Sequence, residues 1–349
     1  MIRHITADTA EFDWTRFDAA ASLRAVLAVA LSLAVGIALG HPREGMYVAY
    51  GAFSVGFGSF VRDRNATTLA RLMTAVGIAV SGIVGHFAGQ LMPTAIVAAA
   101  VWGMMCGTLM ALSSAPVWIG TQWAVSLFLG IAYAKTAGVD PWGRALEMFG
   151  GGLLQTLMMW GFCRIGHEDC DRWESHPGAD TSASLRHDLQ LVTDWTSPVL
   201  RFALRVAVTL GVAEAFARVF GLSNGYWVPM TALIVVRPEL HTTFSRGLAR
   251  VGGTVGGAVV ATMVVSYLHP NLWVLAALVL VCAWLCYNLL LVNYAIYTLA
   301  VTGYVVFLLS LAGAPAKVVV AHRVANTLIG AAVALSLRLL WPTWDTRAV

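Results

Sequence analysis

The sequence predicts an all-α membrane protein in which about twelve helices cross the bilayer as two parallel six-helix repeats. Three observations lead to this fold class. Hydrophobic residues make up 58% of the 349 residues and charged residues only 11%, whereas about 25% of the residues in an average soluble domain are charged. The mean hydropathy is +0.74. Apolar runs of about 20 residues, long enough to cross a bilayer, follow one another with short polar connections.

Each apolar run predicts one spanning helix. In chain order the predicted spans are 19–40, 44–61, 68–90, 93–113, 116–135, 143–163, 198–220, 224–236, 246–268, 271–290, 293–312 and 319–341. The first run has no small-residue cleavage site before the next span, so it predicts a retained helix and not a signal peptide. Lysine and arginine collect in alternate connections, which by the positive-inside rule predicts that both termini are cytoplasmic.

The chain repeats itself with a constant offset. Residues 70–77, ARLMTAVG, lie over residues 249–256, ARVGGTVG, so Arg71 falls on Arg250, an offset of 250 − 71 = 179. Arg144 falls on Arg323 with the same offset. An even number of spans in each half makes both halves point the same way. The predicted organisation is a cytoplasmic N-terminal arm (1–18), a first six-span membrane repeat (19–163), a polar cytoplasmic linker (164–197), a second six-span repeat (198–341) and a cytoplasmic tail (342–349).

The second span of each half is unusually short. In the second half Pro229 lies near its start, and the counterpart in the first half carries Gly51 and Gly56. Short or glycine- and proline-interrupted segments at matching places in two repeats point to the site of a secondary transporter. Irregular backbone at membrane depth survives where protein or a water-filled cavity covers it. We therefore predict that these three residues break the helices beside a transport site, with an ordinary kinked helix as the alternative.

The segment 226–259, YWVPMTALIVVRPELHTTFSRGLARVGGTVGGAV, resembles the signature of the fusaric-acid-resistance family of membrane proteins. The matching positions are Tyr226-Trp227-x-Pro229, Thr231-Ala232-Leu233, Pro238, Arg246 with Arg250, and the glycine pairs 252–253 and 256–257. That family includes bacterial aromatic-acid exporters and is similar to the plant aluminium-activated malate channels. The resemblance implies an exporter or a channel for organic anions in the bacterial inner membrane.

Four arginines are the first candidates for binding the substrate. An ionisable residue within the membrane is costly and is therefore a functional candidate, and a guanidinium can bind both oxygens of a carboxylate. Arg144 and Arg323 are a repeat-related pair at the periplasmic ends of their spans, and Arg71 and Arg250 form the cytoplasmic pair. The alternatives are polar contacts between helices for the first pair and snorkelling anchors for the second.

Other residues extend this predicted site. Asn326 lies on the same helical stripe as Arg323, and Tyr226 and Trp227 offer rings for an aromatic substrate. Glu147, three residues after Arg144, is a candidate proton carrier that couples export to the proton gradient; a charge-neutralising pair with Arg144 is the alternative. Close packing of another helix is predicted at Gly252, Gly253, Gly256 and Gly257.

The function predicted from these features is transport and not catalysis. The sequence has no GxxxxGK[ST], HExxH or GxSxG motif, so we expect no catalytic residues, no cofactor and no metal site. We predict an inner-membrane secondary transporter that exports hydrophobic or aromatic carboxylates and is driven by the proton gradient. A passive organic-anion channel and a membrane scaffold without transport are the alternatives. The expected partners are a small organic anion and membrane lipid, not nucleic acid, while a homodimer or a periplasmic adaptor subunit is left open.

Overall fold

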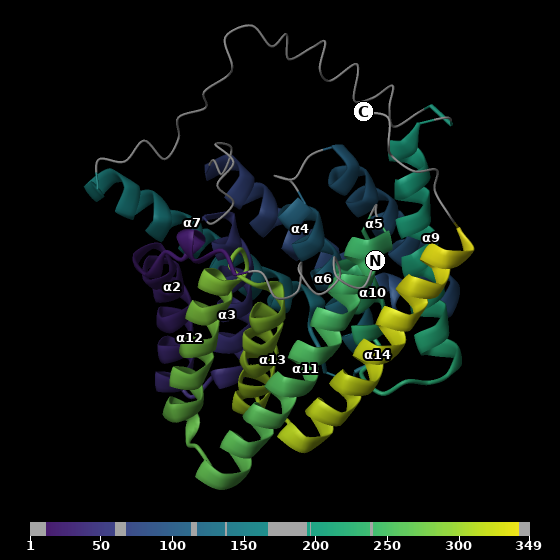
Figure 1. Ribbon diagram of the computed structural model, residues 1–349. Coiled ribbons are helices and arrows are strands. Elements are labelled where there is room, and N and C mark those ends of the chain that lie inside the picture. Colours follow the sequence, from purple (N-terminus) through teal and green to yellow (C-terminus); the bar gives the residue numbers. More distant parts are fainter. Residues whose placement is uncertain are drawn as a thin grey trace, which may run out of the picture.

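The computed structural model describes residues 12–59, 68–112, 117–136, 138–166, 194–195, 197–237 and 240–341. Every regular element in this part of the chain is helical (Figure 1). The all-α prediction is therefore confirmed. The predicted tail 342–349, Pro238, and most of the predicted arm and linker lie outside the described residues.

Each predicted span coincides with one described helix. In the first half these are α2 (Ala19–Ala38), α3 (Pro42–Gly56), α4 (Thr68–Ala88), α5 (Met92–Leu112), α6 (Val117–Tyr133) and α7 (Pro141–Gly166). In the second half they are α9 (Pro198–Val219), α10 (Trp227–Val235), α11 (Leu240–Leu268), α12 (Leu272–Leu289), α13 (Tyr294–Leu311) and α14 (Ala316–Leu340). Two single 3-10 turns, η1 (Trp14–Arg16) and η2 (Phe57–Ser59), precede α2 and follow α3.

The length and composition of the helices define a polytopic membrane protein. Among the described residues, seven helices are long and apolar enough to cross a bilayer: α2, α4, α5, α11, α12, α13 and α14. The second helix of each half is short, with 15 residues in α3 and nine in α10. At 1.5 Å per residue α10 is about 14 Å long, half the thickness of a hydrocarbon core of about 30 Å.

The helix pairings recur in the two halves. Within each half, α4 packs on α6 as α11 packs on α13, and α3 packs on α7 as α10 packs on α14. Between the halves, α5 packs along α9 and α12 along α2, so the fourth helix of each half contacts the first helix of the other (Figure 1). The starts of α2 and α9 are 198 − 19 = 179 residues apart, which is the offset found in the sequence.

The described residues form two large hydrophobic cores and a small cluster of residues from α3, α4 and α7. One is built mainly from α2, α3, α12 and α13, and the other from α5, α6, α9, α10 and α14. Each core therefore takes helices from both halves of the chain. The two halves interlock, and the space between the cores is bounded by residues far apart in sequence.

Two of the three predicted helix breaks are absent. Gly51 lies within the continuous helix α3, where a Cβ would collide with the backbone carbonyl of Met148 on α7. Pro229 is the third residue of α10, in the first turn, where a backbone N–H would have no acceptor within the helix. Gly56 ends α3, and a Cβ there would collide with the ring of Tyr287. The second helix of each half is short but unbroken. The two glycines leave room for Met148 and Tyr287 of neighbouring helices, and the proline lies in the first turn of its helix.

The four glycines of α11 have different surroundings. A Cβ on Gly253 would lie 2.5 Å from the carbonyl oxygen of Ala295, and one on Gly257 would lie 2.5 Å from that of Leu299, so both face α13 at close range. A Cβ on Gly256 would make ordinary contact with the Leu299 side chain. Gly252 faces open space, so the predicted packing role does not apply to it. The residues that face α13 are four apart, on one face of α11.

Candidate functional site

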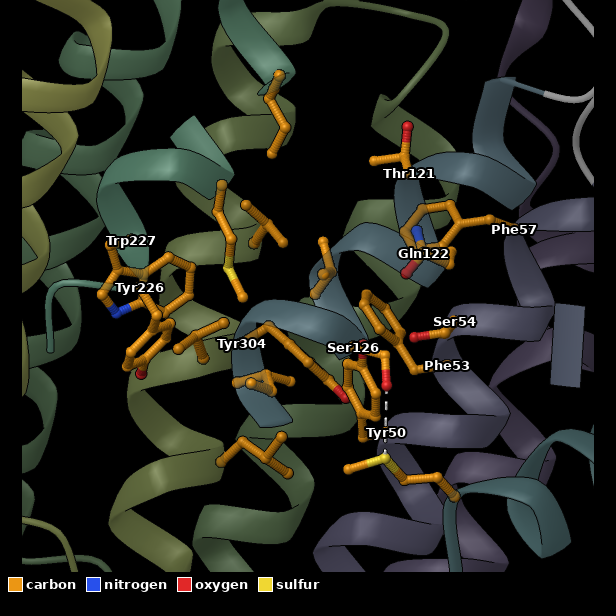
Figure 2. Close-up of a pocket in the computed structure, with 18 of the residues that line it drawn as sticks. Tyr50, Phe53, Ser54, Phe57, Thr121, Gln122, Ser126, Tyr226, Trp227 and Tyr304 are labelled. Atoms are coloured by element: carbon orange, nitrogen blue, oxygen red, sulfur yellow. Dashed lines mark hydrogen bonds between the residues drawn. The ribbon is translucent and has the colours of Figure 1, made fainter. Parts of the chain in front are cut away.

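A cavity of about 540 Å³ lies between the two cores. Its walls come from α3, α4, α5, α6, α7, α10, α11, α13, α14 and the connections between them, so both halves contribute. Figure 2 shows Tyr226 and Trp227 on one side and Phe53, Ser54 and Gln122 across from them. The volume falls within the range of about 300–1,000 Å³ that is typical of small-molecule sites.

The lining is basic and aromatic. Its arginines are Arg144, Arg237, Arg246, Arg250 and Arg323, and no aspartate or glutamate occurs among the described residues that line it. Its aromatic residues are Tyr47, Tyr50, Phe53, Phe57, Trp118, Tyr133, Tyr226, Trp227, Tyr294, Tyr297 and Tyr304. Such a lining favours a ligand with negative charge and flat apolar surface.

Arg323 is the most deeply buried of these cations. Its side chain is 1% exposed, and the guanidinium carbon lies 4.0 Å from the centroid of the Trp227 ring. Nη2 donates a long hydrogen bond of 3.4 Å to the hydroxyl of Thr302. Nε and Nη1 have no hydrogen-bond partner in the described part of the chain. A buried guanidinium with unsatisfied donors is costly.

Arg144 is held between two rings at the other repeat-related position. Its guanidinium carbon lies 4.7 Å from the ring centroids of both Tyr47, on α3, and Tyr133, at the end of α6. This double cation–π contact fixes the side chain without an ion pair. Glu147, on the next turn of α7, is half-buried, does not line the cavity and forms no ion pair with Arg144. Arg144 nevertheless acts on Glu147 electrostatically, so the charge-neutralising pair stays a prediction.

The structure brings together five of the seven predicted substrate-binding residues. Arg144, Arg250, Arg323, Tyr226 and Trp227 all line the cavity. Arg71 and Asn326 do not line it. Arg71 is buried on α4, with 4% of its surface exposed, although its repeat mate Arg250 faces the cavity.

Asn326 holds the turn that leads into α10. Its side-chain nitrogen donates hydrogen bonds of 2.9 Å to the carbonyl oxygens of Ser223 and Asn224. Asn224 adopts a left-handed conformation with φ of 53°, which a bound backbone oxygen helps to keep in place. Because Tyr226 and Trp227 follow this turn directly, Asn326 is a positioning residue and not part of the lining.

We expect Asn326→Ala to lower the free energy of unfolding by about 1–3 kcal/mol, because two backbone acceptors lose a buried donor. Thermal unfolding of the purified protein measures this. His322→Ala is the matched control, since His322 lies on the same helix and contacts the exposed side chain of Asn224 at 3.2 Å. The control should change stability by less than about 0.5 kcal/mol. Equal effects of the two substitutions would contradict the positioning role.

Sequence reasoning did not select several lining residues. Arg237 and Arg246 line the cavity from the connection after α10 and from the start of α11. Arg246 belongs to the segment that resembles the family signature, so the sequence did contain a reason to select it as a site residue. Tyr47 falls on Tyr226 at the same offset, 226 − 47 = 179, so a signal was available for it as well. Tyr133 and Tyr294 gave no signal, because a tyrosine on an apolar helix looks the same whether it faces lipid, core or cavity.

These features define a multi-pass α-helical membrane protein with a buried basic and aromatic cavity. Residues 211–337 match the family described as fusaric acid resistance protein-like. The resemblance seen in residues 226–259 is therefore confirmed by a match that spans about a third of the chain. The match includes α10 to α13 and the first 22 residues of α14, and so contains Trp227, Arg250 and Arg323.

Bacterial relatives are similar to parts of this chain. The protein named "Uncharacterized protein ORF2" of Neisseria gonorrhoeae is 29% identical over 182 residues, 52% of this chain and 42% of that protein. The inner membrane protein YccS of Escherichia coli is 30% identical over 152 residues, 43% of this chain and 21% of that protein. A protein of Salmonella typhimurium named "Uncharacterized transporter YdhK" is 30% identical over 101 residues, 27% of this chain and 15% of that protein. The matches thus cover less than half the length of these relatives. No solved structure matches.

Proposed function

We propose that this protein moves organic anions with aromatic rings across a bacterial inner membrane. The observation that carries the proposal is Arg323, whose buried guanidinium lies on Trp227 and keeps two nitrogens without hydrogen-bond partners among the described residues. A carboxylate would bind these nitrogens while its ring contacts the surrounding aromatic side chains. Two relatives, one named as an inner membrane protein and one as a transporter, support the location and the general function.

The pathway is proposed to use arginines at both ends of the cavity. Arg250 would receive the anion from the cytoplasmic side and Arg323 would hold it against Trp227. Arg144, stacked between two tyrosines, would take it toward the periplasm. An arginine on an aromatic face can exchange that contact for a carboxylate without becoming exposed to lipid.

Two mechanisms fit this pathway. In a proton-driven exporter, Glu147 would carry the proton; in a passive anion channel, no proton carrier is needed. Glu147 lies outside the cavity lining. This observation favours a passive anion channel, which is the second candidate function. A scaffold without transport would give the unpaired donors of Arg323 no role.

Flux into proteoliposomes tests the proposal. The purified protein would face aromatic and dicarboxylic anions with and without an imposed pH gradient, beside the variant Arg144→Gln/Arg323→Gln and the single variant Glu147→Gln. We expect flux of aromatic carboxylates that the double variant loses. Loss of the gradient dependence alone in Glu147→Gln would support the exporter, and gradient-independent conductance would support the channel. Absence of flux for every anion would contradict transport by this chain alone.

A further inference from the structure

Four arginines line the same cavity: Arg237 follows α10, Arg246 and Arg250 lie on α11, and Arg323 lies on α14. Arg237 and Arg246 are close enough to act on one another electrostatically, and so are Arg250 and Arg323. Arg246 and Arg250 lie one helical turn apart on α11, on the same face. We call these four residues the arginine row. Arg237 lies in the connection after α10, and Arg323 lies over the ring of Trp227.

Arg237 and Arg246, together with Tyr294, offer the chemical groups of a second anion-binding site. The guanidinium carbon of Arg246 lies 4.4 Å from the centroid of the Tyr294 ring. The Tyr294 hydroxyl is buried and has no hydrogen-bond partner among the described residues. Arg237 is fixed through its backbone, whose N–H donates to the Thr243 hydroxyl at 3.1 Å, and its own Nη1 donates to the carbonyl of Val236 at 2.8 Å. Two cations and a hydroxyl without a hydrogen-bond partner among the described residues thus belong to the wall of the same cavity.

One carboxylate cannot neutralise this row. A single negative charge at Arg323 leaves Arg237 and Arg246 beside one another, and like charges in a poorly solvated space repel strongly. No described carboxylate lines the cavity to separate them. The favourable arrangement alternates the signs, with one negative charge between Arg250 and Arg323 and another between Arg237 and Arg246.

We propose that the cavity binds two carboxylate charges at the same time, the second of them at Arg237, Arg246 and Tyr294. This inference rests on the proposed function and narrows it. The two charges come from one of two sources. Either one aromatic dicarboxylate bridges the arginine row, or two monocarboxylates bind at the two sites, one behind the other. If two monocarboxylates bind at once, repulsion between them would also speed their release, as it does between ions at adjacent sites of a channel.

Equilibrium dialysis with radiolabelled benzoate and terephthalate tests this proposal, because the two ligands differ only in the second carboxylate. The purified full chain in lipid nanodiscs would be compared with Arg246→Gln, with Arg237→Gln/Arg246→Gln and with Arg164→Gln, an exposed arginine outside the cavity as the control. Thermal unfolding of each variant shows that it is folded.

We expect either two benzoates per chain, or one benzoate and terephthalate binding at least about tenfold tighter. The first result identifies two monocarboxylates and the second identifies one dicarboxylate. In Arg246→Gln and in Arg237→Gln/Arg246→Gln, the protein should lose the second bound benzoate or, in the other case, the higher affinity for terephthalate. The affinity for the remaining benzoate should stay within about threefold of its original value. One benzoate per chain with no advantage for terephthalate would overturn the second site. Failure of both ligands to bind the unaltered protein would instead contradict the proposed function.

Discussion

Replacing Arg323 with glutamine is expected to weaken the binding of an aromatic carboxylate by about 30-fold or more. Loss of one partner from a buried, hydrogen-bonded charge pair costs about 2–5 kcal/mol, and each 1.4 kcal/mol is about a tenfold change in affinity. The residue is 1% exposed and faces the cavity, so water cannot replace the lost contact. Binding of radiolabelled benzoate to the purified variant measures the effect.

The same variant should be at least as stable as the unaltered protein when no anion is present. The substitution removes a buried positive charge whose Nε and Nη1 have no hydrogen-bond partner among the described residues, and removal of such a charge relieves a desolvation penalty. Arg164→Gln, at an exposed arginine, is the control for both measurements and should leave them unchanged. A variant that loses thermal stability in parallel with binding would show that Arg323 serves the fold and not the ligand.

Replacing Gly151 with alanine is expected to lower the free energy of unfolding by about 1–3 kcal/mol or more, because overpacking forces the backbone apart. A Cβ on Gly151 would collide with the carbonyl group of Val48, just as one on Gly51 would collide with that of Met148. The two glycines thus let α3 and α7 touch through their backbones. Thermal unfolding of the purified variants measures the cost.

The neighbouring residue provides a matched control. Gly150 lies on the same helix, and a Cβ there meets nothing within 4 Å. Gly150→Ala should be neutral or stabilising by up to about 1 kcal/mol, since alanine favours a helix over glycine. Because α3 carries Tyr47 and α7 carries Arg144, Gly151→Ala should also weaken anion binding, whereas Gly150→Ala should not. A similar loss of stability in both variants would contradict the close contact between α3 and α7.

Much of the fold could be predicted because the length and spacing of apolar runs depend only on residues that are near one another in the sequence. The shortness of α10 followed from counting the apolar residues between Tyr226 and Arg237. The effects of Gly51 and Pro229 could not be predicted in the same way. Whether a glycine breaks a helix or admits a neighbour depends on the partner, here Met148 on another helix, and local patterns do not contain that partner.

The candidate site was predictable where charge is rare. An arginine in an apolar span stands out, so Arg144, Arg250 and Arg323 could be selected before the cavity was known. The repeat made Arg71 and Arg250 equivalent, yet only Arg250 lines the cavity. That difference depends on which helices close around the space between the cores, and the sequence offset says nothing of it. The stacking of Arg144 between Tyr47 and Tyr133 likewise joins residues from three helices.

The most direct test of the central claim is a crystal structure of the protein saturated with para-iodobenzoate, located by the anomalous scattering of iodine. We predict an iodine peak inside the cavity, with the carboxylate within hydrogen-bond distance of Arg323 and the ring against Trp227 or its aromatic neighbours. A cavity without iodine, in crystals of protein that binds the compound elsewhere, would contradict an anion site at Arg323.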